Sequence, residues 1–339
     1  MAARLNRAWR LAKRPHGIVC ESDLDLREEM LPDLEPGDVL VRHIYLSLDP
    51  TNRIWMSDRD QYMPPVRLND VMRGLTIGII EESRDLARAP GTVVSAPGGW
   101  QDYFVGPGKA VLPIEMLPGL PLTAHLSVLG MTGLTAYFGL VDIGAPKPGE
   151  TLVVSAAAGA VGSIAGQIGK IEGCRVVGIV GSRAKSEWIT RDLGFDAAID
   201  YKAERVGERL SALCPKGIDI DFENVGGEIF DAVLARLSLN ARIVLCGLIS
   251  SYNATEPVPG PYNFANVLMK RATIRGFIVS DFAKRYPEGL AALGAWVAEG
   301  KIKYRVDIAD GLENAVASLN RLFRGENIGK LLVRVSPEP

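Results

Sequence analysis

The stretch that decides the fold is VVSAAAGAVGSIAGQIGK, residues 153–170. It runs from β-branched residues through small residues into a helix-like segment, with nothing larger than Val between Ala156 and Gly162. Ala157, Gly159 and Gly162 have the spacing A-x-G-x-x-G, a dinucleotide-binding fingerprint with Ala in place of the first Gly. Such small residues let a pyrophosphate approach the backbone at the start of a helix. Close packing of a helix on a sheet would remove the same side chains without any ligand.

The sequence around this turn favours the nucleotide reading. From about residue 128, strand-like segments alternate with amphipathic helical segments, and six β segments are expected. This order is typical of an α/β fold with a Rossmann-like, doubly wound parallel sheet made of two mononucleotide-binding halves. The expected strands are 151–156, 174–180, 197–201, 217–225, 241–247 and 272–279.

The rest of the chain has a different pattern. The first 125 residues or so are rich in Pro, Gly and short β-branched runs, with strands expected at 38–48, 76–83 and within 91–106. A tail after residue 303 is expected to form a strand, a helix and a last strand that rejoins the N-terminal domain. We therefore expect a β-rich domain of residues 1–127 and 305–339, and a Rossmann-like domain of residues 128–304.

Bulk composition excludes several classes of protein. The chain has 339 residues, with 38 basic against 40 acidic side chains and a formal net charge of -2, so it has no general attraction for nucleic acid or an anionic membrane. No apolar run approaches the roughly 18 residues that span a bilayer. The basic N-terminus, residues 1–17, lacks the apolar core of a secretory signal. Its Arg content is a weak sign of a transit peptide, but it leads directly into folded-looking sequence, which favours a cytoplasmic protein.

Cysteine and histidine positions give no sign of a metal site. They are scattered along the chain without the spacing of metal ligands, so we expect no metal. Free thiols in a reducing cytosol are the simplest interpretation of the cysteines. The residues are Cys20, Cys174, Cys214, Cys246, His16, His43 and His125.

The end of the second strand of the Rossmann-like domain indicates which dinucleotide would bind. An acidic residue there would accept hydrogen bonds from the ribose 2′-hydroxyl of NAD, whereas basic residues accommodate the 2′-phosphate of NADP. This chain has Ser182, Arg183 and Lys185 and no acid at the strand end. The pattern favours NADP(H). The alternative is that both cations are ordinary solvated residues at a helix start, where they would oppose the helix dipole.

At this point the residues resemble a known family, the zinc-independent medium-chain dehydrogenases/reductases. The most similar group is the leukotriene B4 dehydrogenase/prostaglandin reductase family, which includes 2-alkenal and curcumin reductases. The resemblance covers essentially the whole chain in several independent motifs. They are YLSLDPTNR (45–53), GWQDYFV (99–105), LGMTGLTAYFGLVDIGAPKPGETLVVSAAAGAVGSIAGQIGKIEGCRVVGIVGS (129–182), FENVGGEIFDAVL (222–234), ARIVLCGLISSYN (241–253), GFIVSDF (276–282) and RGENIGKLLVRV (324–335).

The resemblance implies an NADPH-dependent reductase of the carbon–carbon double bond of α,β-unsaturated aldehydes and ketones. It also implies a GroES-like first domain, a small-molecule substrate and a homodimer. By the same resemblance, the pyrophosphate turn is Gly159, Ala160, Val161 and Gly162, and the 2′-phosphate contacts are Ser182, Lys185 and Tyr201. The remaining implied cofactor contacts are Asn224, Cys246, Gly247, Ser250, Tyr252, Phe277, Ile278, Val279 and Asn327.

Several of these positions have a structural alternative. Cys246 would serve equally as a small buried apolar residue, and Tyr201 as a half-buried aromatic at a strand end. Residues 277–279 would fill a parallel-sheet core with or without a cofactor. Only the joint occurrence of these residues favours the cofactor.

The chain also departs from the family pattern. Thr51 and Asn52 stand where many relatives have Tyr-Met, so the shape of the substrate pocket does not carry over, and Thr132 stands where Pro is usual. Residues 61–63, Gln-Tyr-Met, fit either a substrate-facing loop or a surface turn stiffened by proline.

The chemistry of a conjugated enone requires little from the protein besides geometry. Hydride added to the β-carbon leaves negative charge on the carbonyl oxygen, so the site needs a hydrogen-bond donor there. Tyr252 is the candidate, because a phenol stabilises an enolate and passes on a proton. The alternatives are that Tyr252 only packs against the cofactor, or that the cofactor's ribose 2′-hydroxyl is the donor. Two rival functions remain open: a quinone reductase, and a non-catalytic NADPH-binding module.

Overall fold

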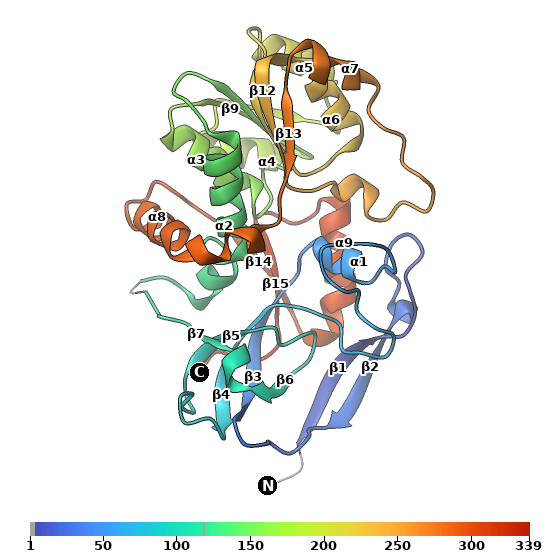
Figure 1. Ribbon diagram of the computed structural model, residues 1–339, viewed down its shortest axis with the longest axis vertical. Coiled ribbons are helices and arrows are strands. Elements are labelled where there is room, and N and C mark those ends of the chain that lie inside the picture. The colour runs from blue at the N-terminus through green and yellow to red at the C-terminus, as the bar shows by residue number, and fades with distance from the viewer. Residues whose placement is uncertain (1–3, 118) are drawn as a thin grey trace. The chain divides into compact units, whose positions relative to one another are not determined.

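The computed structural model describes residues 4–117 and 119–339, which divide into two compact units (Figure 1). The first unit contains the described residues up to Leu126, together with Val306–Asn327 and Leu331–Pro339. The second contains Ser127–Arg305 and the short segment Ile328–Lys330. The chain therefore passes from the first unit to the second and back near its C-terminus.

A six-stranded parallel sheet forms the centre of the second unit, with the strand order β10-β9-β8-β11-β12-β13. This confirms the predicted doubly wound sheet. The order reverses between β8 and β11, which is where ligands bind outside the carboxyl ends of the strands in such folds. The strands are β8 (Thr151–Val154), β9 (Arg175–Val180), β10 (Ala197–Asp200), β11 (Ile218–Glu223), β12 (Leu237–Leu245) and β13 (Thr273–Gly276).

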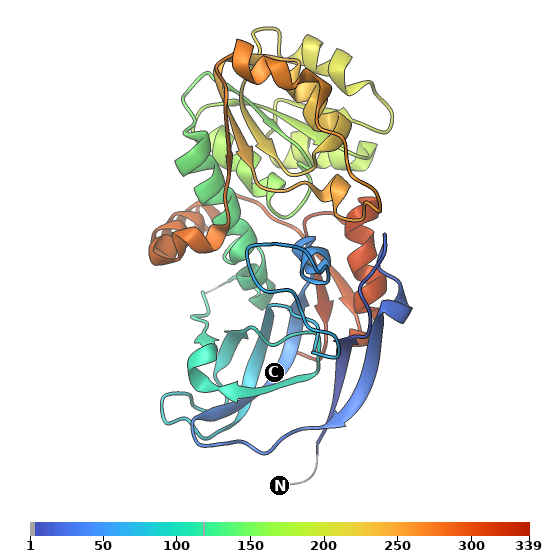
Figure 2. The same cartoon turned by 45° about the vertical axis from the view of Figure 1, so that its right-hand side comes forward.

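Helices cover both faces of this sheet, as the two ribbon views show (Figures 1 and 2). The face that carries α5 and α6 buries one continuous apolar cluster, which includes Val153, Val177 and Ile243 from three strands. The helices of this unit are α2 (Met131–Phe138), α3 (Gly162–Ile171), α4 (Arg183–Glu187), α5 (Val206–Leu213), α6 (Gly227–Leu234), α7 (Ala265–Met269) and α8 (Tyr286–Ala298).

Helix α3 lies so close to its neighbours that two of its glycines have no room for a side chain. A Cβ added at Gly166 would lie 1.9 Å from the Phe195 ring, and one at Gly169 would lie 2.4 Å from Leu152. Close packing thus explains the small residues in the body of the helix. It does not explain Gly159, where an added Cβ would meet only the carbonyl oxygen of Ala156, at 3.1 Å.

The first unit is a mainly antiparallel seven-stranded sheet, with the order β14-β15-β3-β4-β5-β7 and β6 on β3, beside a separate β1-β2 pair. As expected, the last strand of the tail, β15, pairs with β3. The elements are β1 (Leu5–Leu11), β2 (Leu24–Met30), β3 (Asp38–Ser47), α1 (Thr51–Trp55), β4 (Thr76–Ser83), β5 (Val93–Ala96), β6 (Tyr103–Pro107), β7 (Leu112–Pro113), β14 (Val306–Asp310), α9 (Ala315–Arg324) and β15 (Lys330–Arg334).

The basic N-terminal stretch is part of this fold from Leu5 onward. Strand β1 pairs with β2 from Leu5 opposite Met30 to Leu11 opposite Leu24, and Trp9 and Leu11 are buried. Its arginines, three positions apart, broke the alternating pattern by which a strand is predicted. Residues 1–3 of the possible leader lie outside the described residues. None of the helices in the described chain combines the length and apolar character that crossing a bilayer needs.

Candidate active site

The residues predicted to contact a cofactor follow the six strands of the parallel sheet, except for Asn327. The turn at 159–162 follows β8, Ser182 follows β9, Tyr201 follows β10, Asn224 follows β11, and the segment 246–252 follows β12. Residues 277–279 follow β13. Because parallel strands end at the same edge, the structure brings these segments to one end of the sheet. Asn327 belongs to the first unit, directly before the segment Ile328–Lys330.

The turn between β8 and α3 is shaped by close backbone contacts. Ala156 has a positive φ of 49°, and the amide of Gly159 donates to the Ala156 carbonyl at 2.8 Å. A Cβ added at Gly162 would lie 2.5 Å from that carbonyl oxygen, so the helix can begin there only with glycine. The amide of Gly329 also holds the turn in place by donating a hydrogen bond to the carbonyl of Ala158 at 2.8 Å.

The start of α3 presents open hydrogen-bond donors. Among the described residues, the backbone amides of Val161 and Gly162 have no hydrogen-bond partner, and Val161 at the N-cap provides no capping side chain. The first amide with a partner is that of Ser163, which donates to the carbonyl of Gly159 at 3.1 Å. Unpaired amides at the positive end of a helix dipole attract an anion. The turn therefore fits a diphosphate.

The segments after β9 and β10 meet at Gly181. A Cβ added at Gly181 would lie 2.8 Å from the Tyr201 ring, so that ring covers the strand end beside Ser182. The Ser182 hydroxyl caps α4 by accepting from the amide of Lys185 at 3.3 Å, and the Lys185 side chain is buried. Arg183, in contrast, is exposed and pairs with Glu187 at 2.9 Å. Of the two cations, Arg183 is thus the ordinary solvated residue at a helix start.

Strand β11 ends with a buried carboxylate, Glu223, that sequence reasoning missed. Glu223 accepts hydrogen bonds from the Ser155 hydroxyl at 2.9 Å, from the amide of Gly226 at 2.7 Å, and from the amide of Val225. Burial raises the pKa of Glu223, and these hydrogen bonds oppose the rise. The signal in the sequence was the series of acidic residues in IDIDFE, because a strand buried on both faces of a parallel sheet is usually apolar.

Asn224 is engaged with the neighbouring strand. Its backbone amide donates to the Ser155 hydroxyl at 2.7 Å, and its side-chain amide donates to the Ser155 carbonyl at 2.8 Å. Asn224 therefore joins the loop after β11 to the turn after β8.

The segment after β12 is hydrogen-bonded to the same loop. The amides of Cys246 and Gly247 donate to the carbonyl of Glu223 at 2.9 and 3.1 Å, and the Ser250 hydroxyl donates to the carbonyl of Val225 at 2.6 Å. Cys246 is half-buried. Desolvation, and then the charge of Glu223, raise the pKa of the Cys246 thiol to about 12, so it is neutral at physiological pH.

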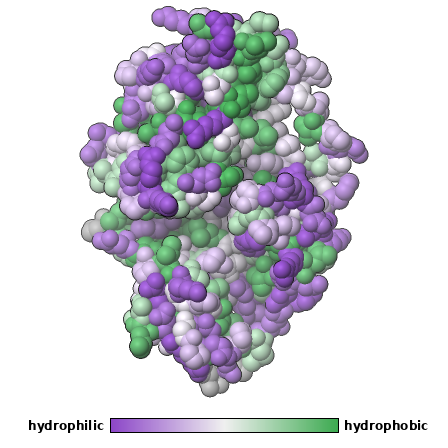
Figure 3. All heavy atoms as spheres, viewed as in Figure 1, coloured by the Kyte–Doolittle hydropathy of each residue, from purple (hydrophilic) through white to green (hydrophobic). Residues whose placement is uncertain are grey.

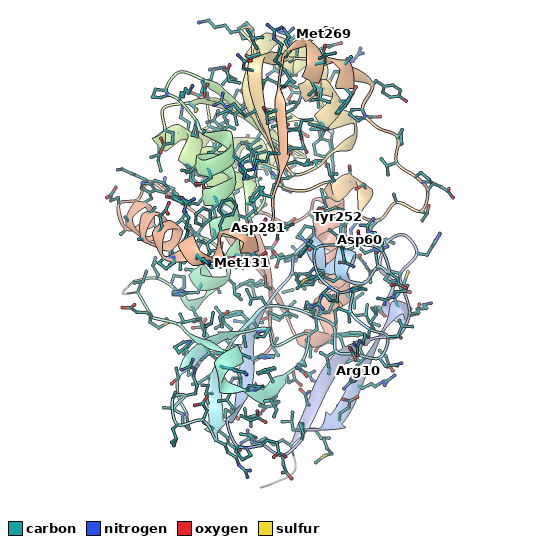
Figure 4. The ribbon with its side chains drawn as sticks, in the orientation of Figure 1. Arg10, Asp60, Met131, Tyr252, Met269 and Asp281 are labelled. Atoms are coloured by element: carbon teal, nitrogen blue, oxygen red, sulfur yellow. The ribbon has the colours of Figure 1, made fainter. Side chains whose placement is uncertain are left out.

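Tyr252 ends this segment with its phenol folded back over the backbone (Figure 4). Its hydroxyl oxygen accepts a hydrogen bond from the amide of Leu248 at 3.1 Å. A Cβ added at Gly247 would lie 3.2 Å from that oxygen, so glycine leaves room for the phenol. The hydroxyl thus has a defined position.

The expected strand 272–279 is wrong over its last three residues. Strand β13 ends at Gly276, Ile278 is extended, and Val279 begins a 3-10 helix that runs to Arg285. Phe277 is half-buried and packs edge-to-face against Phe282 with ring centroids 6.3 Å apart. These residues therefore line the end of the sheet and do not fill its core.

In the first unit, the substituted pair after β3 has two different roles. Asn52 is buried, and its side-chain oxygen accepts from the amide of Asp49 at 2.8 Å, so it supports a turn. The Thr51 hydroxyl is hydrogen-bonded to that of Tyr62, which also accepts from the Trp55 indole at 2.8 Å. Gln61 bonds back to the carbonyl of Ser57 at 3.0 Å. The loop that carries residues 61–63 is thus held against α1.

Two further features of the sequence concern Thr132 and a possible metal site. Thr132 is buried and donates to the carbonyl of Ser127 at 2.9 Å. Within residues 4–117 and 119–339, no three His, Cys, Asp or Glu side chains come together in a group that could hold a metal ion.

Comparison with known proteins agrees with this geometry. Family models match residues 7–114, described as the N-terminal domain of oxidoreductase, and residues 160–295, described as zinc-binding dehydrogenase. The chain is 48% identical over 336 residues to the NADPH-dependent curcumin reductase of Escherichia coli (strain K12), covering 98% of this chain and 97% of that protein. It is 40% identical to prostaglandin reductase 1 of Bos taurus, covering 97% of this chain and 98% of the relative. The crystal structure of CurA in complex with NADPH from Vibrio vulnificus superposes with a TM-score of 0.93 at 45% identity, covering 98% of this chain and 100% of that one.

Proposed function

Because this chain belongs to the medium-chain dehydrogenase/reductase family, within its 2-alkenal/curcumin reductase group, we propose that it reduces the carbon–carbon double bond of α,β-unsaturated aldehydes and ketones with NADPH. The observation that supports this most directly is the pair of unpaired amides at Val161 and Gly162, at the point where the strand order reverses. A docking position for a diphosphate at this point is what a dinucleotide-dependent enzyme requires.

Different residues of the second unit bind different parts of the cofactor. When bound, NADPH supplies the hydride that is added to the β-carbon of the substrate. The amides of Val161 and Gly162 hold the diphosphate, while Ser182, Lys185 and Tyr201 hold the 2′-phosphate. The buried Lys185 ammonium gives the phosphate a counter-charge in a poorly solvated position, where a charge pair is stronger than in water.

Tyr252 is the proposed donor to the substrate. Hydride addition to the β-carbon leaves an enolate, and a phenol aimed at its oxygen would stabilise that charge and donate a proton to the oxygen. The resulting enol tautomerises to the saturated carbonyl compound, and the phenolate regains its proton from solvent. One well-placed donor of this kind contributes about 3 kcal/mol to the transition state. The Leu248 amide holds the Tyr252 oxygen in place, so the donor is positioned before the substrate arrives.

The test is Tyr252→Phe with trans-2-hexenal as substrate. Loss of the hydroxyl should lower kcat/KM about 100-fold, whereas Tyr262→Phe, at a 90% exposed position, should leave it unchanged. If Tyr252→Phe keeps kcat/KM within about twofold, the phenol is not the donor, since tenfold corresponds to about 1.4 kcal/mol.

The substrate class needs its own comparison. With NADPH, the wild-type enzyme should reduce 2-alkenals faster than 1,4-quinones. It should also reduce 2-alkenals faster with NADPH than with NADH. Faster turnover of quinones would make it a quinone reductase. Tight binding of NADPH without oxidation by any acceptor would make it a binding module.

We further propose that the protein is a homodimer formed through β13. This strand is the edge of its sheet, where it pairs with β12 alone among the described residues, and most of it is exposed. Apolar side chains gather around it, and Figure 3 shows a hydrophobic band where α7 and β13 lie. Exposed apolar residues here are Val258, Tyr262, Phe264, Leu268 and Met269. An edge strand with an apolar border suits pairing with the same strand of a second copy across a twofold axis.

Light scattering after size exclusion tests the dimer. Met269, labelled at the end of α7 in Figure 4, is 60% exposed and Leu268 is 73% exposed. Replacing both with Asp should give a monomer. Leu86→Asp, at a fully exposed position in the first unit, should remain a dimer. A wild-type monomer, or a double variant that stays dimeric, would contradict the proposed interface.

The cytoplasm is the proposed location of the enzyme. None of its four cysteines forms a disulfide, as is usual for proteins of a reducing compartment. Fractionation of the expressing cell should recover the NADPH-dependent activity with cytosolic markers.

A further inference from the structure

Glu223 is an unusual residue for its place in the fold. It is completely buried at the end of the central strand β11, where both faces of a parallel sheet are covered and apolar residues are the rule. A buried carboxylate is costly unless hydrogen bonds compensate for the lost water. The hydrogen bonds that it makes therefore show why it is there.

The side chain of Glu223 connects two loops that are far apart in the sequence. One carboxylate oxygen accepts from the Ser155 hydroxyl, which follows β8, and from the amides of Val225 and Gly226, which precede α6. The Ser155 hydroxyl also accepts from the amide of Asn224, which extends the connection. Three donors that converge on one oxygen favour its ionised form.

The backbone carbonyl of Glu223 is hydrogen-bonded to a third loop. Its carbonyl accepts from the amides of Cys246 and Gly247, which follow β12. A single residue is therefore hydrogen-bonded to the segments after β8, β11 and β12. These are the segments that carry the proposed contacts to the diphosphate and to the nicotinamide end of the cofactor.

A second buried acid lies next to Glu223 in the strand. Asp221, two residues earlier, points to the same side of β11, and in the described structure neither of its carboxyl oxygens has a hydrogen-bond partner. Burial and the neighbouring charge raise the pKa of Asp221 well above its ordinary value. Since the donors converge on one oxygen of Glu223 and Asp221 has none, Glu223 ionises before Asp221 as the pH rises.

We propose that Glu223 is a positioning residue, whose carboxylate and backbone carbonyl tie the loops after β8, β11 and β12 into one unit and so fix the cofactor-binding groups. The identity of the ligand rests on the proposed function, whereas the coupling of the loops rests on the hydrogen bonds alone. Removal of the carboxylate should therefore loosen segments that are distant in sequence.

Hydrogen exchange of the cofactor-free protein tests the coupling. Glu223→Ala should increase amide exchange in 155–162, in 224–227 and in 246–252, and Glu223→Gln should restore protection because its side-chain oxygen still accepts. Asp219→Ala is the matched control, since Asp219 accepts from the amide of Thr151 at 2.8 Å at the other end of the same two strands. Its effect should stay near Thr151. Faster exchange in 224–227 alone, or the same pattern in both alanine variants, would overturn the proposal.

Titration of NADPH by its fluorescence, well below the melting temperature of each variant, tests the consequence for the cofactor. Glu223→Ala should raise the Kd about tenfold or more, as expected when at least two hydrogen bonds to a charged group are lost. Glu223→Gln should stay within about threefold and Asp219→Ala within about twofold of wild type. Should Glu223→Ala fail to fold, Ser155→Ala removes one donor only and should raise the Kd about threefold or more. Unchanged binding in the folded variants would overturn the positioning role.

The two proposals fail separately. If wild-type protein does not bind NADPH, the proposed function is wrong, while hydrogen exchange still reports whether Glu223 couples the loops. If NADPH binds and is oxidised but Glu223→Ala behaves as wild type in both measurements, only the positioning role is wrong.

Discussion

The turns after β8 and β11 follow neighbouring strands of one sheet and differ in whether their backbone amides have a hydrogen-bond partner. After β11, the carboxylate of Glu223 accepts from the amides of Val225 and Gly226, directly before α6. After β8, the amides of Val161 and Gly162 at the start of α3 have no partner in the described chain. Amides at the positive end of a helix attract an anion. The turn after β11 thus has an internal acceptor and the turn after β8 has none, which leaves room there for an external anion.

Residue size accounts for the difference. The open turn is made only of Ala, Gly and Val between residues 156 and 162, so no side chain reaches its amides. The closed turn begins with Glu223, whose side chain is long enough to fold back over the next three residues. A carboxylate placed in the open turn should therefore make the two turns alike.

Gly159→Asp should have the largest effect. A carboxylate at this position would cap α3 and repel a diphosphate, and NADPH affinity should fall about 100-fold or more, because at least two charge-assisted hydrogen bonds are replaced by repulsion. Calorimetric titration measures the loss. Gly159→Ala is the control, because an added Cβ meets only the Ala156 carbonyl at 3.1 Å, and it should cost less than about tenfold. Equal losses in both variants would mean that size, and not charge, closes the turn.

Lys185→Met should have an intermediate effect on cofactor affinity. Lys185 lies in a third turn, after β9, where the Ser182 hydroxyl caps α4. Removing the buried charge should lower NADPH affinity about tenfold and leave NADH affinity unchanged, because only NADPH carries the 2′-phosphate. The ratio of the two affinities is the measurement. Arg183→Met, at an exposed ion pair with Glu187, should change the ratio less than about twofold. Parallel loss of both cofactors in Lys185→Met would exclude a 2′-phosphate contact.

Asp221→Asn should have the smallest effect and concerns stability alone. Because burial raises the pKa of Asp221, the folded protein keeps a proton that the unfolded chain releases above about pH 4. This contribution to stability is complete below that pH and is lost as pH rises through the pKa of the folded state. The melting temperature of wild type should therefore fall more than that of Asp221→Asn between pH 5 and pH 8. Identical pH dependence in the two proteins would show that Asp221 does not titrate differently on folding.

Much of the second unit could be predicted because its signals are local. Strands and helices alternate with clear periodicity from residue 151, and this order specifies a doubly wound sheet. The turn at 156–162 was recognisable because its small residues follow a strand directly. In contrast, β1 was hidden by its arginines, and the last strand was expected to run three residues too far, because an apolar run does not show where hydrogen bonding ends.

The pairing of polar groups could not be predicted from local pattern. Ser155 and Glu223 are 68 residues apart, and nothing near either one indicates the other. The acids of β11 alternate with apolar residues, and only the fold places Glu223 among three donors and Asp221 among none.

The sequence by itself determined the succession of strands and helices and the position of a turn without side chains, because both depend on residues near one another in the chain. Only the tertiary structure decided which turn receives a carboxylate and which has none. The reason is that a buried amide takes its partner from whatever the fold brings within about 3 Å, and that partner can lie anywhere in the chain.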